Sequence, residues 1–224
     1  MKHSLLPTLA IAAAVGLLAL APAARGALVN GGFETPAIGP ATFQNIGVGA
    51  EPAGFAWTVT NDNVDLFSNG VLSTTAVAYE GVQALDLVGF GSAGGVSQSM
   101  STTLGTTYRL RFAYANNPIS TGGASARIDI TDGATSLLAR SVTHATSTTS
   151  DFDWDLFEAT FVGTGNAVTL RFVNTVGQNN GGVFLDAVSV DVVPPSQVPL
   201  PPTLALAALA LLCARGTRRP ARRG

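Results

Sequence analysis

The chain has 224 residues and a formal net charge of −2 at pH 7. Residues 27–197 contain five arginines, no lysine and all 14 acidic residues, which gives this segment a formal charge of −9. Such a segment repels nucleic acid, because the basic groups that contact phosphates are missing. The single cysteine, Cys213, lies outside it, so disulfides within the segment are excluded.

The first 26 residues are predicted to be a secretory signal peptide. A short basic start, Met1-Lys2-His3, precedes an almost wholly apolar run over residues 5–21. Small residues at Ala23 and Gly26 offer cleavage positions. We therefore expect the exported chain to begin a few residues before Asn30.

Residues 27–192 are predicted to form one all-β domain, an antiparallel two-sheet sandwich of jelly-roll type. Large apolar residues alternate with small or polar ones at period two, and no stretch shows helical periodicity. Clusters of Gly, Asn, Ser, Thr and Pro indicate turns, and nine to eleven short strands are expected. The clearest strands are 63–67, 84–88, 95–100, 108–114, 127–131, 137–143, 156–161, 168–173 and 188–192. A spacer, 193–197, follows.

Motifs for catalysis are weak in this domain. Residues 89–94 fit G-x-G-x-x-G, but a strand pattern follows where a dinucleotide site needs a helix, so they are predicted to be an inter-strand loop. The domain's one histidine, His144, is interpreted as an exposed loop residue. With no Gly-x-Ser-x-Gly motif and no cysteine, the domain is not predicted to be an enzyme. A carboxylate pair acting on a glycan stays an alternative.

The last 27 residues form a three-part tail. Prolines in 198–202 stop any strand, the apolar run 203–214 enters lipid as a short helix, and five arginines stay on the cytoplasmic side. The residues of the first and third parts are Val198, Pro199, Leu200, Pro201 and Pro202, then Arg215, Arg218, Arg219, Arg222 and Arg223 in segment 215–224. The 12-residue apolar run is shorter than the roughly 20 residues of a stable spanning helix, which indicates a temporary anchor.

This tail resembles the PEP-CTERM sorting signal of Gram-negative bacteria, with Leu200 at the position of the usual glutamate. The resemblance implies recognition and cleavage by an exosortase-type transpeptidase. It also implies export across the inner membrane, transient anchoring there, and a final location at the cell surface or outside the cell.

A second resemblance covers nearly all of the domain. Its residues are the opening run 28–36 and the closing run 182–190, with Trp57, Asp65, Glu80-Gly81, 86–89, 105–108 and 116–118 between them. In this order they resemble the choice-of-anchor C domain of PEP-CTERM proteins, which is similar to galactose-binding-like carbohydrate-binding modules. The resemblance implies a structural calcium ion held by Glu34 and Asp186, and no organic cofactor.

The sequence itself leaves two interpretations of Asp186. This residue shares strand parity with Phe184, Val188 and Val190, the apparent buried face. An inward carboxylate is costly unless it is paired or bound to metal, which favours a metal ligand. Alternatively, the strand begins at Ala187 and Asp186 lies in a loop, hydrogen-bonded to the backbone.

Sugar binding calls for an aromatic platform flanked by amide and carboxylate groups. The candidates in predicted loops are Phe67, Tyr79, Phe90, Asn116 and Asn117. The expected function is that of an exported surface or matrix protein whose non-catalytic sandwich binds polysaccharide. The alternatives are a structural or adhesion protein of the matrix without sugar binding, or a carbohydrate-active enzyme.

Overall fold

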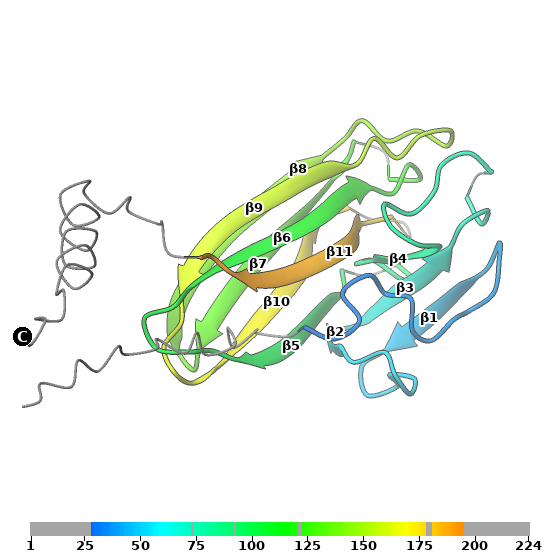
Figure 1. Cartoon of the computed structure of the whole chain (residues 1–224). Coiled ribbons are helices and arrows are strands. Elements are labelled where there is room, and N and C mark those ends of the chain that lie inside the picture. The colour runs from blue at the N-terminus through cyan, green and yellow to red at the C-terminus, as the bar shows by residue number, and fades with distance from the viewer. Residues whose placement is uncertain (1–27, 73, 92, 121, 178–180, 195–224) are drawn as a thin grey trace, which may run out of the picture. The chain divides into compact units, whose positions relative to one another are not determined.

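The computed structural model describes residues 28–194, except residues 73, 92, 121 and 178–180. The predicted signal peptide and sorting tail, including the apolar run 203–214, lie outside these residues. No helix in the described part is long and apolar enough to cross a membrane. The described residues form eleven strands (Figure 1): β1 (Phe43–Gly47), β2 (Thr58–Asn61), β3 (Asn63–Ser68), β4 (Gln83–Asp86), β5 (Gly95–Ser101), β6 (Thr107–Asn116), β7 (Ala124–Asp132), β8 (Thr135–His144), β9 (Asp155–Val162), β10 (Ala167–Val176) and β11 (Val183–Val192).

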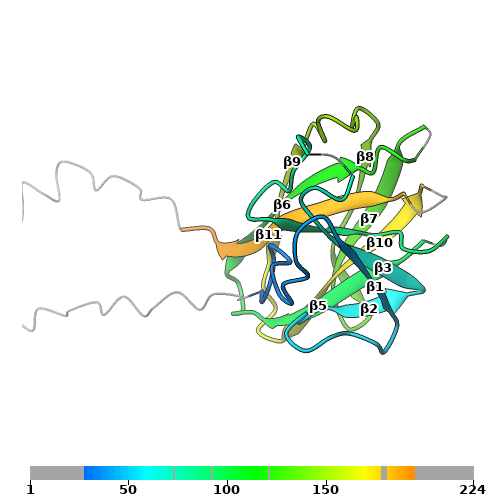
Figure 2. The same ribbon diagram turned by 90° about the vertical axis from the view of Figure 1, so that its right-hand side faces the viewer.

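The strands form two antiparallel sheets. One has the order β1-β3-β4-β11-β6-β9 and the other β2-β5-β10-β7-β8. Figure 2 shows the two sheets as separate layers. The expected all-β, two-sheet sandwich is confirmed. The nine clearest expected strands correspond to β3–β11, whereas the short strands β1 and β2 were not expected.

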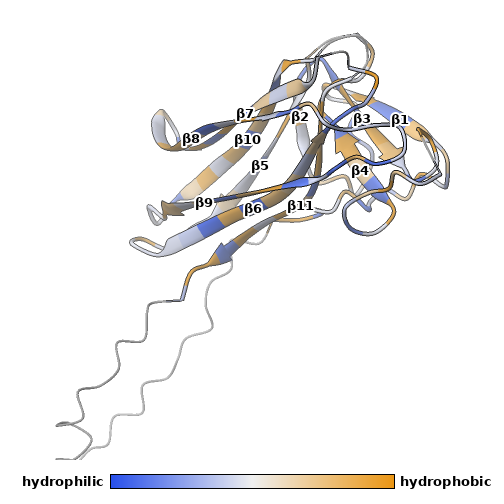
Figure 3. Ribbon diagram, turned by 90° about the horizontal axis from the view of Figure 1, so that it is seen from above, coloured by the Kyte–Doolittle hydropathy of each residue, from blue (hydrophilic) through white to orange (hydrophobic). Residues whose placement is uncertain are grey.

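The core lies between the two sheets, because strands on both sides direct every second side chain inward. The alternation is visible along β6 and β10 in Figure 3. Phe112 of β6 contacts Phe172 of β10 with ring centroids 5.0 Å apart, and Trp57 contacts the same ring at 6.1 Å. Each such aromatic pair contributes about 0.5–1.5 kcal/mol beyond the area it buries. The two sheets are therefore joined by apolar packing.

Strand β11 contains a bulge that changes which face its side chains occupy. The pairing with β6 shifts by one residue between Asp186 and Ser189, and Ala187 has a φ of 49°. Leu185 before the bulge and Val188 after it both belong to the core. Asp186 therefore lies on the opposite face from Val188, and the inference that the two share a face was wrong because the extra residue reverses the parity.

The outer face of the six-stranded sheet carries a second apolar cluster. Side chains of the sheet pack there under the segment after β3 and the segment before β9; the buried members are Phe67, Ala76, Ala78, Ala84, Ala115, Phe152 and Phe184. Trp154 packs against this cluster and donates a hydrogen bond from Nε1 to the carbonyl of Val77, at 2.9 Å. The two covering segments are thereby held to each other over part of the sheet face.

Candidate functional site

A row of cross-strand partners runs over the outer face of the six-stranded sheet. Asn45 pairs with Asp65, Asp65 with Asp86, Asp86 with Phe184, and Phe184 with Ala115. Directly opposed residues of antiparallel strands point to the same face and lie within contact distance. Five strands thus contribute to the row, and three of them, β1, β3 and β4, place an amide and two carboxyl groups side by side.

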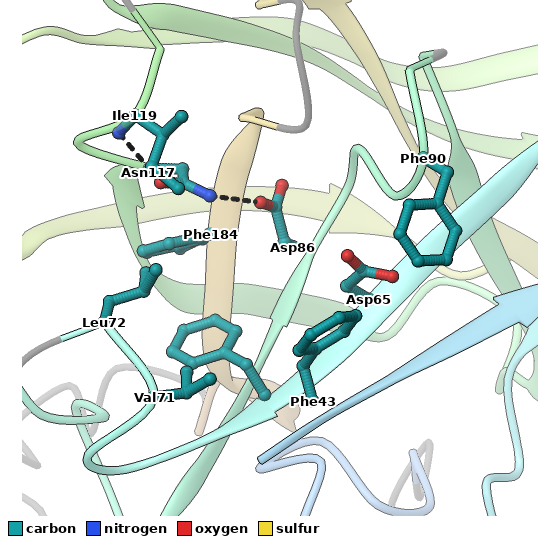
Figure 4. Close-up of a pocket in the computed structure, with 10 residues that line it drawn as sticks. Phe43, Asp65, Val71, Leu72, Asp86, Phe90, Asn117, Ile119 and Phe184 are labelled. Atoms are coloured by element: carbon teal, nitrogen blue, oxygen red, sulfur yellow. Dashed lines mark hydrogen bonds between the residues drawn. The ribbon is translucent and has the colours of Figure 1, made fainter. Parts of the chain in front are cut away.

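A pocket of about 280 Å³ opens over this row. Figure 4 shows the carboxyl groups of Asp65 and Asp86 next to each other, with Phe43 and Phe90 on the Asp65 side and Asn117 beside Asp86. Apolar side chains form most of the remaining wall: Phe67, Val71, Leu72, Ile119 and Phe184. The pocket therefore combines an apolar wall with a small polar floor, as small-molecule sites commonly do.

Asp86 is 2% exposed and its carboxyl group is held by three donors. Its Oδ1 accepts hydrogen bonds from the backbone N–H of Val88 at 2.9 Å and of Gly182 at 3.0 Å. Its Oδ2 accepts one from Asn117 Nδ2 at 2.8 Å. Burial, with a smaller effect from the neighbouring Asp65, raises the pKa of Asp86 to about 8.

Asp65 and the Phe90 loop are fixed by two asparagines. Asn45 Nδ2 donates to Asp65 Oδ1 at 2.7 Å and to Asn63 Oδ1 at 2.8 Å. Asn63 Oδ1 also accepts the backbone N–H of Phe90, at 2.6 Å. Burial raises the pKa of Asp65 above its usual value. The same network thus positions a carboxylate and the backbone of an aromatic residue.

Phe43 and Phe90 form the exposed rim of the pocket. Their side chains are 49% and 60% exposed, although each is a large apolar group. Their rings meet edge to face, with centroids 6.1 Å apart and planes at 73°. Large apolar side chains gathered at the mouth of a pocket are typical of a contact surface for a ligand.

The structure brings three of the five predicted ligand residues to this pocket: Phe67, Phe90 and Asn117. Tyr79 lies instead in a separate hollow, of about 440 Å³, beside Arg111 and Leu156. Asn116 is buried and contacts the ring Nδ1 of His144 at 2.8 Å. The predicted sorting residues 198–202 and the tail arginines lie outside the described residues.

Two interpretations of motifs can be compared with the structure. Residues 89–94 connect β4 to β5, as expected for an inter-strand loop. His144 ends β8 and is only 4% exposed, so its interpretation as an exposed loop residue was wrong. Its Nε2 contacts the carbonyl of Asp153 at 2.7 Å, so both ring nitrogens are used in internal contacts.

Phe43, Asp65 and Asp86 were not among the predicted ligand residues. For the two aspartates a signal was present, because Asp65 alternates with the apolar Val64 and Leu66, and Asp86 alternates with the apolar Leu85 and Leu87. A carboxylate at the centre of a short strand with apolar neighbours points to the face opposite the core. Phe43 had no such signal, because its strand was not expected.

The two predicted calcium ligands lie at a second place on the molecule. Asp186 lies in β11 and is fully buried; its Oδ2 accepts the N–H of Glu80 at 2.9 Å and its Oδ1 that of Ala187 at 2.6 Å. Glu34 Oε1 accepts the N–H groups of Val82 and Gln83, at 2.8 and 3.0 Å. Burial, with a smaller effect from the negative charge of Glu34, raises the pKa of Asp186 to about 7.

The donor set at Glu34 and Asp186 fits a calcium ion only in part. Calcium takes six to eight oxygen ligands, and two carboxylates supply a minority of them. In the described part of the chain, no group of three or more His, Cys, Asp or Glu residues suits a metal ion. Further ligands would therefore have to be uncharged oxygens, such as backbone carbonyls, amide side chains or water. Asp186 lies within β11, as the metal-ligand interpretation requires. It also accepts hydrogen bonds from the backbone, as the loop interpretation requires, so features of both occur together.

The fold is similar to that of several solved carbohydrate-binding modules. One is TmCBM61, solved in complex with β-1,4-galactotriose, at 16% identity and a TM-score of 0.46, covering 74% of this chain and 97% of that one. A family 35 module from Clostridium thermocellum has 14% identity and a TM-score of 0.41, covering 66% and 97%. The CBM22-1 xylan-binding domain of Xyn10C from Paenibacillus barcinonensis has 14% identity and a TM-score of 0.40, covering 70% and 96%.

The curated proteins contain no match to this chain. A protein-family model matches residues 26–191, which include every described strand except the last residue of β11. The matching family is described as a protein of unknown function, DUF642. The chain belongs to the DUF642 family.

Proposed function

We propose that the domain binds polysaccharide, without catalysis, through the pocket over Asp65 and Asp86. The observation that carries this proposal is the exposed edge-to-face pair of Phe43 and Phe90 beside two carboxylates and the Asn117 amide. A sugar ring has apolar C–H faces that pack on aromatic rings, and hydroxyl groups that donate to carboxylates. The pocket offers both kinds of contact within one site.

The size of the pocket sets how much of a glycan it would hold. Its 280 Å³ is close to the lower end of the roughly 300–1,000 Å³ of small-molecule sites. One sugar unit would fill it, and the neighbouring units would lie against the exposed rim formed by Phe43 and Phe90 and against the exposed Ile119. Both oxygens of Asp86 already accept protein hydrogen bonds, which supports a role in positioning.

Removal of the exposed rings should abolish binding. We expect F43A and F90A each to weaken binding of a recognised glycan by tenfold or more, because the apolar contact with the ring is lost. The full chain would be screened on a glycan array, and the affinity of each variant for the recognised glycans would then be measured by calorimetry.

The matched control is L104A. Leu104 is 76% exposed and precedes the start of β6, whereas Asn117 at the pocket follows its end. L104A removes a similar apolar area far from the pocket and should leave affinity unchanged. If the folded wild-type chain binds no glycan on the array, the result would instead support a matrix protein without sugar binding. Release of reducing sugar from a bound glycan would support an enzyme.

Export and sorting form the second part of the proposal. The signal peptide, the Val198–Pro202 motif and the tail arginines support secretion, transient anchoring in the inner membrane and processing by an exosortase-type enzyme. The product would be located at the cell surface or in the extracellular matrix. Intact mass measurement of the protein recovered from cells with and without such an enzyme would test this: a chain that keeps residues 203–224 in both contradicts processing.

Calcium at Glu34 and Asp186 is the third part. The two negative side chains lie close enough to interact, and among the described residues neither forms an ion pair. A bound cation would compensate both charges and stiffen the contact between the opening segment and β11. We expect added calcium to raise the melting temperature of the wild-type chain and EDTA to lower it. Neither reagent should change the melting temperature of E34Q. An unchanged wild-type melting temperature in EDTA would exclude the site.

A further inference from the structure

The two carboxyl groups at the floor of the pocket have no cationic partner within the described part of the chain. Asp65 and Asp86 are direct cross-strand partners on the same face. All five arginines of the segment 27–197 are engaged elsewhere: Arg109 and Arg111 with Glu158, Arg127 with Asp129, Arg140 with the carbonyl of Ala139, and Arg171 with Asn61. The segment has no lysine that could take their place.

The floor is poorly suited to a metal ion. Asp86 uses both oxygens to accept N–H groups, and the described residues hold no group of three potential metal ligands. Six or more oxygens are needed around calcium, whereas most of the pocket wall is aromatic or aliphatic. The lining is therefore complementary to a cation that carries an apolar body.

The aromatic side of the pocket points to the same chemistry. The rings of Phe43 and Phe90 lie on the Asp65 side of the pocket (Figure 4). An ammonium group over an aromatic face gains about 0.5–2 kcal/mol, the larger figure applying when water is excluded. A group placed between these rings and Asp65 would interact with both the π-system and the carboxylate.

We propose that the pocket binds an amino sugar with a free amino group, a hexosamine unit of a polysaccharide that is not N-acetylated. The ammonium group lies over Asp65, with Asp86 as the neighbouring carboxyl group, and the pyranose ring packs on Phe43 and Phe90. This inference rests on the proposed polysaccharide binding and names its ligand class. The raised pKa of Asp86 supports it, since a buried acid without a counter-charge is one that a bound ammonium would stabilise in its ionised form. The charge of −9 over residues 27–197 also favours association with a cationic glycan.

Three trimers with the same β-1,4 linkage test the inference: glucosamine, N-acetylglucosamine and glucose. Calorimetry with the full chain should give an affinity for the glucosamine trimer at least tenfold higher than for the other two. The variant D65N keeps the size of the side chain and removes its charge, so it should bring the three affinities within about twofold. Asp65 is half-buried, which makes D65N the safer variant, and its melting temperature verifies folding. The variant D86N, if its melting transition shows that it folds, would be compared with the wild type on the same three trimers.

The other outcomes separate the two proposals. Equal affinities for all three trimers in the wild type, unaffected by D65N, would overturn the amino-sugar inference and leave polysaccharide binding intact. A preference for glucosamine that D65N does not reduce would place the ammonium elsewhere and also overturn it. Tight binding of trilysine, at the affinity of the glucosamine trimer, would show that the pocket selects ammonium groups without a sugar ring, and it would overturn the amino-sugar inference. No binding of any glycan by a folded chain would remove both proposals.

Discussion

Two buried carboxyl groups make the stability of the domain depend on pH. Burial raises the pKa of Asp86 from the usual 3.8 to about 8, and that of Asp186 to about 7. The folded chain therefore binds more protons than the unfolded chain between about pH 4 and these values. The free energy of unfolding falls with rising pH wherever the folded state binds more protons. The stabilisation is complete below about pH 4 and is lost as pH rises through 7 and 8.

The melting temperature should accordingly decrease from pH 5 to pH 8. In D86N the decrease should be smaller, because one group no longer ionises in the folded state; the charged neighbour that faces it, Asp65, remains. Differential scanning fluorimetry across this range, in a calcium-free buffer so that Asp186 carries no metal, makes the comparison. The control is D191N, at an exposed position of β11, which should keep the wild-type slope. A wild-type melting temperature that rises over this range would contradict the assignment.

At the residue scale, part of the site could be predicted. Aromatic and amide residues in polar loops are recognisable as candidates, and Phe90 and Asn117 do line the pocket. The two carboxyl groups at the floor of the pocket, Asp65 and Asp86, were missed because they lie within strands. They form a pair only because β3 and β4 place them opposite each other. The alternation of residues along a strand shows which face of the sheet each aspartate occupies. It does not show which residue lies opposite that aspartate on the next strand.

The bulge of β11 is the local element on which the opening segment rests. The N–H of Val188 donates to the carbonyl of Gly31 at 2.9 Å, and a methyl group at Gly31 would overlap the carbonyl oxygen of Val188. We expect G31A to lower the free energy of unfolding by about 1–3 kcal/mol, as overpacking does. Urea unfolding would measure the loss.

The comparison variant is G47A at the end of β1. A methyl group there meets no atom within 4 Å. G47A should leave stability unchanged or raise it by up to about 1 kcal/mol, because alanine restricts the unfolded chain. Equal stability of G31A and G47A would show that the opening segment does not rest on the bulge.

At the scale of strands, the long alternating segments were predictable and the exceptions have physical causes. β1 and β2 have only five and four residues and contain few large apolar side chains, Phe43 and Ile46 in β1 and Val59 in β2, so a period of two cannot be distinguished from an irregular loop. The bulge follows from a single residue, Ala187, whose positive φ is not encoded by a glycine. One inserted residue reversed the expected face of Asp186 relative to Val188, and its burial agrees with only one of the two interpretations that the sequence left open.

For the whole molecule, composition and turn spacing were sufficient to predict an all-β sandwich. The order of strands within each sheet was not predictable in the same way, because it depends on contacts between distant segments. β4, for example, lies between its sequence neighbour β3 and the last strand, β11. The pocket is built on this non-local pairing.

That pairing has a consequence for when the pocket can form. Asp86 accepts a hydrogen bond from Gly182, 96 residues further along the chain, and Phe184 of the same terminal strand lines the pocket. A chain that is still being synthesised has no complete pocket until its last strand, β11, is present. The order of the strands therefore delays completion of the pocket until nearly the whole domain has been synthesised.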